Sequence, residues 1–154
     1  QIAAVLAQAD APHAERYRTN AERLRSRLAT LDAELERRLA PLRSRPFLVF
    51  HDAYAYLEAR YGLLAVGAIA LHPEQPPGAR RVLALRERLR EAGAVCVFAE
   101  PQFEPRLLRT LVEGSALRTG VLDPLGAALP DGPGLYPALL EGLARSLAEC
   151  LGAP

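Results

Sequence analysis

Two hydrophobic patterns divide the chain near residue 46. Before that point, apolar residues recur at spacings of three and four among many charged residues, which is the period of one helix face. The apolar stripe consists of Tyr17, Ala21, Leu24, Leu28, Leu31, Leu35 and Leu42. Asp10 and Pro12 suit a helix start, because aspartate caps helices and proline fits the first turn. The pattern predicts a helix of about 30 residues, about 45 Å long, which Pro46 ends.

This long helix has two interpretations. A leucine repeat of this length is typical of a coiled coil, in which residues 13–43 would pair with a second copy. In the competing interpretation the helix is a strut that braces or joins two lobes. The two differ in whether the stripe packs on its own lobe or on another chain.

Beyond residue 46, short apolar runs alternate with helical stretches. The runs span 47–50, 63–71, 94–99 and 117–122, and the helical stretches span 53–61, 79–92, 104–113 and 135–151. Apolar strands separated by helices indicate a parallel sheet that is covered on both faces, with right-handed crossovers. The predicted fold class is α/β: a long connecting helix, then a lobe with a roughly four-stranded parallel sheet flanked by helices.

Composition narrows the classes of function. The formal net charge is +1, without a basic stretch that could follow a nucleic-acid backbone, so we expect no nucleic-acid partner. Every cationic side chain other than histidine is arginine, which argues against P-loop and Schiff-base chemistry that needs lysine. The longest apolar run is shorter than the roughly 20 residues that span a bilayer. Cys96 and Cys150 lack a C-x-x-C partner, which leaves one long-range disulfide or two inert thiols.

Polar side chains follow three of the predicted strands. His51 and Asp52 come after the first run, Glu100 after the third and Asp123 after the fourth. Ligands of parallel α/β sheets bind beyond the carboxyl ends of the strands, so these residues are the candidate site. An imidazole near carboxylates suits zinc or iron better than calcium.

Each candidate also has a purely structural interpretation. Asp52 is expected to cap the helix that follows it rather than to bind metal, and Asp123 before a proline suits the start of a turn. His51 alone would be an ordinary histidine at a strand end. His72 and His13 are assigned no ligand role. The first strand-to-helix turn has no glycines, and no G-x-S-x-G elbow is present, which excludes two common enzyme signatures.

Four segments resemble one family closely. They are residues 47–56, with the sequence FLVFHDAYAY, then PPGA at 76–79, CVFAEPQF at 96–103 and LDPLG at 122–126. They resemble the C-terminal half of the periplasmic zinc-binding proteins that feed bacterial ABC importers, the ZnuA type. The resemblance covers essentially the whole chain, and it makes the long helix the rigid connection between the two lobes of that fold.

The resemblance implies a set of functional residues. In this family zinc lies between two α/β lobes, and the C-terminal lobe supplies one histidine and one aspartate, which match His51 and Asp123. Glu100 matches a buried residue beside the site. Related manganese-binding proteins have a glutamate at the position of His51, so an imidazole there favours zinc. Cys96 and Cys150 match a pair that forms a disulfide in many zinc-binding members.

The resemblance also implies an incomplete molecule. The N-terminal lobe, its histidine ligands and the His-rich loop of many members have no counterpart here, so we expect a C-terminal fragment. The expected parts are residues 1–9 as a helix remnant of the missing lobe, 10–45 as the inter-lobe helix and 46–154 as the metal-binding lobe. Ile2, Val5 and Leu6 would then be disordered or covered by a second copy.

The sequence therefore predicts a binding protein without catalysis. The full-length molecule would capture zinc in the periplasm and deliver it to a membrane permease. One alternative is a metal-dependent enzyme that uses His51, Asp123 and Glu100 as a facial triad. Another is a manganese- or iron-binding relative of the same family, and a homodimer of this chain is also compatible with the pattern.

Overall fold

The structure is a computed structural model that describes residues 1–70, 78–102 and 106–152. It divides into two compact units, Gln1–Glu34 and Leu35–Pro154. His72 and the PPGA segment up to residue 77 lie outside the described residues, as does Phe103. In the described part of the chain, no helix is both long enough and apolar enough to cross a membrane.

The first unit contains helix α1 (Ile2–Ala9), the 3-10 turn η1 (Ala11–His13) and most of the long helix α2 (Ala14–Leu39). The side chain of Asp10 caps no backbone amide, contrary to the prediction. Its carboxylate instead accepts a hydrogen bond from the Tyr17 hydroxyl at 2.9 Å and lies 3.0 Å from His13 Nδ1. These two side chains satisfy Asp10 from within the same unit.

The predicted long helix is present, and its C-terminal boundary was predicted wrongly. Helix α2 ends at Leu39 and continues as the 3-10 turn η2 (Ala40–Leu42), which contains Pro41. Pro41 is the reason, because proline donates no backbone hydrogen bond and disfavours helical geometry in the residue before it. Leu35 and Leu39 are almost completely buried. The end of the apolar stripe therefore packs within the second unit.

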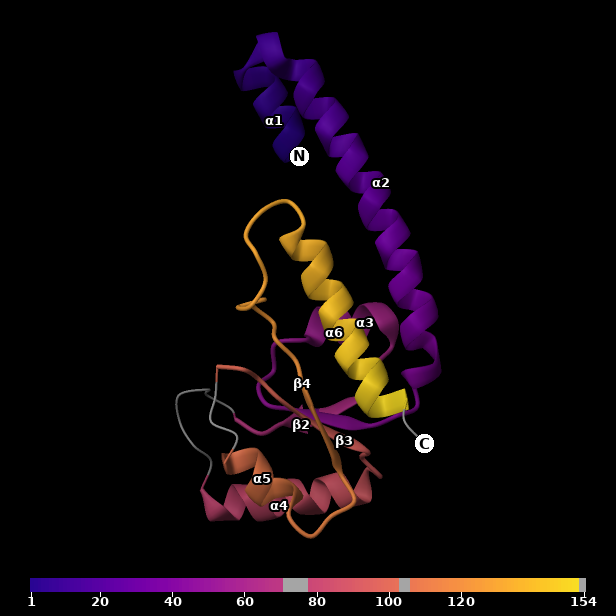
Figure 1. Ribbon diagram of the computed structural model, residues 1–154, viewed down its shortest axis with the longest axis vertical. Helices are drawn as coiled ribbons and strands as arrows, with labels where there is room; N and C mark the ends of the chain where they lie inside the picture. The colour runs from indigo at the N-terminus through magenta and orange to yellow at the C-terminus, as the bar shows by residue number, and fades with distance from the viewer. Residues whose placement is uncertain (71–77, 103–105, 153–154) are drawn as a thin grey trace. The chain divides into compact units, whose positions relative to one another are not determined.

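The second unit is a parallel α/β lobe (Figure 1). Its elements are β1 (Phe47–Val49), α3 (Ala55–Tyr61), β2 (Ala65–Ala68), α4 (Ala79–Glu91), β3 (Cys96–Ala99), α5 (Arg106–Val112), β4 (Arg118–Val121) and α6 (Leu135–Gly152). The four strands pair in parallel in the order β2-β1-β3-β4, with Phe47 opposite both Ala65 and Cys96. The predicted fold class is confirmed.

Helices cover both faces of this sheet, with α4 and α5 on one face and α3 and α6 on the other (Figure 1). The α4–α5 face contains a cluster that includes Leu48, Val97, Leu85 and Leu111. On the opposite face, the rings of Phe47 and Phe98 meet edge to face with centroids 5.5 Å apart. Because successive strand residues point to opposite faces, each strand supplies both cores.

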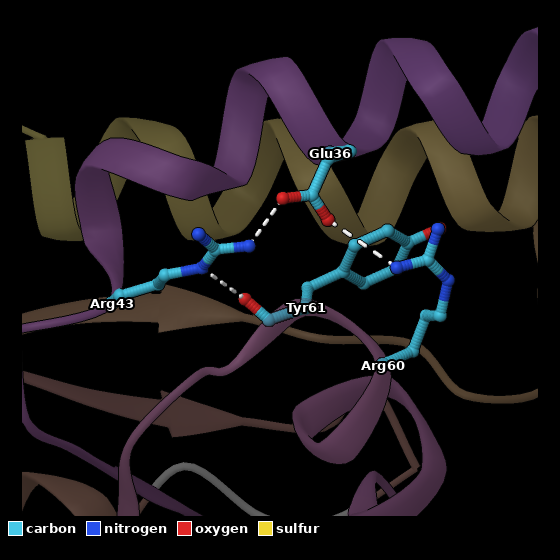
Figure 2. Close-up of polar contacts among 4 residues, drawn as sticks. All are labelled: Glu36, Arg43, Arg60 and Tyr61. Atoms are coloured by element: carbon cyan, nitrogen blue, oxygen red, sulfur yellow. Dashed lines mark hydrogen bonds and ion pairs between the residues drawn. The ribbon is translucent and has the colours of Figure 1, made fainter.

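The end of α2 is joined to α3 by a small polar network (Figure 2). The Glu36 carboxylate forms ion pairs with Arg43 and, at 3.4 Å, with Arg60 of α3. Arg43 Nε also donates a hydrogen bond to the Tyr61 carbonyl at 2.9 Å, and the Arg60 guanidinium lies 5.1 Å from the centre of the Tyr61 ring. These contacts attach the base of the long helix to the first crossover helix of the lobe.

A disulfide joins the sheet to the last helix. Cys96 in β3 and Cys150 in α6 are bonded, with their Cα atoms 6.1 Å apart. This confirms the pairing that the family resemblance implied. The bond closes a chain segment with a sequence separation of 54 residues and lies in the core between α6 and the sheet.

Candidate metal site

The predicted site residues lie at the carboxyl edge of three neighbouring strands. His51 follows β1, Glu100 follows β3 and Asp123 follows β4, and these strands are adjacent in the sheet. The chain runs from β1 to β2 on one side and reaches β3 on the other, so the strand order reverses between β1 and β3. Ligands of open α/β sheets bind at such a point. His51 and Glu100 lie on either side of it.

His51 and Glu100 form the centre of this edge. His51 Nδ1 lies 3.9 Å from Glu100 Oε1, and the side chains are 34% and 4% exposed, respectively. Burial raises the pKa of Glu100, and the His51 charge and the Tyr54 hydrogen bond offset part of that effect. A partly exposed imidazole beside a buried carboxylate is a common arrangement in metal sites, where the carboxylate orients the ring.

Tyr54 also lies at this edge, and no pattern in the sequence singled it out. Its side chain is 4% exposed, and its hydroxyl lies 3.3 Å from both Glu100 Oε1 and the Leu122 carbonyl oxygen. Burial, followed by the adjacent Glu100 carboxylate, raises the pKa of Tyr54 far above its usual range, so the phenol keeps its proton. A tyrosine in a buried segment needs a hydrogen-bond partner for its hydroxyl, and this need could have indicated Tyr54 from the sequence.

Asp123 organises the loop that follows β4. Its Oδ1 atom accepts hydrogen bonds from Gln102 Nε2 and Gly126 N, both at 3.0 Å, and from Leu125 N at 3.1 Å. Its Oδ2 atom accepts one from Ala127 N at 2.7 Å. Desolvation acts to raise the pKa of Asp123, but these hydrogen bonds outweigh it and lower that pKa. The turn interpretation is confirmed, and the carboxylate is held as an anion at the edge of the sheet.

Asp52 does not cap the next helix, contrary to the prediction. Helix α3 begins at Ala55, two residues later than expected, and the residue at its N-cap position is Tyr54. Tyr54 is buried and lies before the first residue of the helix. Asp52 is exposed, and its charge acts on Glu58 of α3.

The described residues contain no cluster of three metal-binding side chains. Among residues 1–70, 78–102 and 106–152, no three His, Cys, Asp or Glu side chains are grouped so that they could hold an ion. The facial-triad interpretation would need His51, Glu100 and Asp123 to form such a group. An imidazole and a carboxylate are nevertheless donors that zinc accepts.

Fold and site together define a class. The second unit is a parallel α/β lobe, and the carboxyl edge of its sheet carries an imidazole and two carboxylates, donors typical of metal-binding proteins. The chain belongs to the ZnuA family: the model of the zinc-uptake complex component A, periplasmic, matches residues 1–150.

Relatives with similar sequences carry the same family name. The high-affinity zinc uptake system protein ZnuA of Brucella abortus (strain 2308) is 49% identical over 150 residues, covering 97% of this chain and 45% of the relative. The protein of that name from Paracoccus denitrificans (strain Pd 1222) is 42% identical over 153 residues, covering 99% and 47%. The chain thus spans less than half the length of these curated relatives.

Solved structures show the same fold. A crystal structure of ZnuA matches with a TM-score of 0.81 and 28% identity, covering 97% of this chain and 53% of that one. The Zn(II)-bound E280Q variant of AdcAII from Streptococcus pneumoniae matches with a TM-score of 0.77 and 27% identity, covering 97% and 54%. The comparisons therefore confirm the resemblance to zinc-binding transport proteins.

Proposed function

We propose that this chain is one lobe of a solute-binding protein that captures zinc in the periplasm and delivers it to an ABC permease. The observation that carries the proposal is the carboxyl edge of the sheet. His51 follows β1, beside the point where the strand order reverses, and Asp123 follows β4, two strands away. Membership of the zinc-uptake family supports zinc as the cargo. The names of the relatives describe a zinc uptake system.

In this proposal His51 and Asp123 are the zinc ligands of the lobe. His51 coordinates through its imidazole and Asp123 through a carboxylate oxygen. Glu100 lies beside the His51 ring and orients it rather than binding the ion. An imidazole ligand also favours zinc over manganese, which prefers oxygen donors.

Tetrahedral zinc takes four ligands, so two ligands must come from elsewhere. We propose that a second lobe supplies them and that residues 1–9 are a helix remnant of that lobe. Residues 10–45, which contain α2, would connect the two lobes, and residues 46–154 would be this metal-binding lobe. The site binds and releases an ion, and no residue in it is assigned to catalysis.

Zinc titration calorimetry of the chain tests this proposal. We expect weak binding of one ion, and we expect His51→Ala to abolish it because one of two protein ligands is lost. His13→Ala is the matched control, because His13 is an exposed histidine of the first unit that also lies beside an aspartate. Binding that is indifferent to His51→Ala, or that is lost equally in His13→Ala, would show that the site is misplaced.

A further inference from the structure

We propose that Tyr54 is the positioning residue of this half-site: its buried hydroxyl joins the ends of three strands and holds Glu100 against the His51 ring. The inference rests on the proposed zinc-binding function. Tyr54 itself touches neither the expected ion nor a reacting group, so it acts entirely through its neighbours.

The position of Tyr54 in the chain is the first argument. It lies three residues after His51, in the segment between β1 and α3, and its ring points into the lobe with 4% exposure. Its hydroxyl reaches Glu100, at the end of β3, and the carbonyl of Leu122, directly before Asp123. The Tyr54 hydroxyl oxygen therefore contacts residues at the ends of β3 and β4, while the backbone of Tyr54 follows β1.

The geometry of the hydroxyl is the second argument. Both acceptors lie at 3.3 Å, which is long for a single O–H to O bond and suits one proton placed between two acceptors. Glu100 Oε1 is the same oxygen that lies 3.9 Å from His51 Nδ1. The phenol thus fixes the oxygen that faces the imidazole, and it does so without adding a charge.

The consequence concerns preorganisation. A side chain that must be ordered when the ion arrives costs conformational entropy at that step, whereas one already held does not. The His51 backbone amide also donates a hydrogen bond to the Glu100 carboxylate, so removal of the Tyr54 hydroxyl leaves that carboxylate with one contact fewer and loosens the orientation of the His51 ring that it faces. Substitution of partners behind metal ligands typically weakens metal binding by about 10- to 100-fold. Tyr54 lies one contact further away than Glu100, so we expect the lower end of that range.

The test compares Tyr54→Phe with Tyr17→Phe in zinc calorimetry. Both variants remove a hydroxyl that contacts a carboxylate, since Tyr17 donates to Asp10 at 2.9 Å in the first unit. We expect zinc binding about tenfold weaker in Tyr54→Phe and unchanged in Tyr17→Phe. We also expect the ring ¹⁵N shifts of His51 in the zinc-free chain to change in Tyr54→Phe only, which a general loss of stability does not produce.

A second variant covers the case in which Tyr54→Phe does not fold. Glu100→Ala removes the group through which Tyr54 acts, and we expect it to weaken zinc binding at least as much. Wild-type affinity in either variant, or unchanged His51 shifts in a folded Tyr54→Phe protein, would overturn the inference and leave the proposed function intact. Absence of zinc binding in the wild-type chain would overturn the proposed function and the inference with it.

Discussion

At the scale of single residues, close packing around Gly120 limits which residues β4 can carry. A Cβ atom built on Gly120 would lie 2.6 Å from Phe98 Cε1 and 3.4 Å from the Cβ of Cys150. Phe98 is completely buried and its ring packs on Phe47, so it has no free space to move into. Gly120 is therefore required for steric reasons and not for its backbone conformation.

We expect Gly120→Ala to lower the free energy of unfolding by about 1–3 kcal/mol, the usual cost of overpacking a core. Gly142→Ala is the matched control, because a Cβ at Gly142 meets nothing within 4 Å and the residue lies inside α6. Alanine there should stabilise the helix by up to about 1 kcal/mol. Chemical denaturation measures both, and equal effects of the two substitutions would contradict the steric argument.

Glu58 of α3 carries a second prediction at this scale, for pH dependence. Burial, and then the nearby Asp52 charge, raises the pKa of Glu58, and its Oε1 atom is buried without a hydrogen-bond partner. A folded-state pKa above the unfolded value means that ionisation of Glu58 destabilises the fold. The contribution of Glu58 to the free energy of unfolding is therefore fully present below its unfolded-state pKa, about 4.3. It is lost as the pH rises through the folded-state pKa.

Glu58→Gln should therefore stabilise the chain at neutral pH and remove the loss of stability that Glu58 causes as the pH rises. Thermal melts from pH 4 to 8 measure both effects. Glu87→Gln is a control of opposite sign, because the hydrogen bond from Arg90 lowers the pKa of Glu87. That group contributes stability above its unfolded pKa, and the contribution is lost as pH falls through the folded value. If the melting temperature of Glu58→Gln fell as the pH rose, by as much as in the wild type, the assignment to Glu58 would be refuted.

At the scale of elements, contacts between distant segments hold the lobe together. The Glu36 network attaches the end of α2 to α3, and the Cys96–Cys150 bond attaches β3 to α6 (Figures 1 and 2). The Glu36 ion pairs are half-exposed, so salt and solvent screen them and their contribution is small. The disulfide is the stronger of the two connections.

Removing the disulfide tests that ranking. For a loop of this length, loss of the cross-link frees unfolded-chain entropy worth about 4 kcal/mol on the chain-entropy argument. We expect the Cys96→Ala/Cys150→Ala variant to lose stability on that order in chemical denaturation. Glu36→Gln should cost less than about 1 kcal/mol. A larger loss in Glu36→Gln than in the double cysteine variant would reverse the ranking.

At the scale of the whole molecule, the two units differ in how completely they cover their own apolar side chains. In unit Gln1–Glu34, Ile2 and Val5 of α1 are 80% and 63% exposed. Helix α1 is formed, and what covers its exposed side chains in solution stays a prediction. The unit Leu35–Pro154 has its own core on both faces of the sheet.

The proposed division of the zinc site leads to a prediction about affinity. Zinc held by four protein ligands in small domains has an apparent binding free energy of about 10–16 kcal/mol. A lobe that supplies two ligands should lose at least about 5 kcal/mol of that, which is more than a thousandfold in the dissociation constant. Calorimetry of this chain beside the full-length Brucella abortus relative measures the difference. Equal affinities would mean that this chain holds a complete site.

The element order, the parallel sheet and the strand-end positions of His51, Glu100 and Asp123 followed from the sequence alone. They depend on apolar periodicity and on turn residues, which are local properties of the chain. The family resemblance added the cysteine pairing, which no local pattern contains. The end of α2 was mispredicted because the apolar stripe continues past Pro41 as far as Leu42, although the helix does not.

Only the tertiary structure decided which of these groups touch. The Tyr54 hydroxyl meets partners 46 and 68 positions away, and Gln102 meets Asp123 across 21 positions. Such contacts depend on the strand order β2-β1-β3-β4, which the apolar runs do not specify. The cap expected at Asp52 is absent because α3 begins at Ala55, and Tyr54, at the N-cap position, is buried with its hydroxyl among the strand ends. Local pattern sets the elements, and packing sets the partners of their side chains.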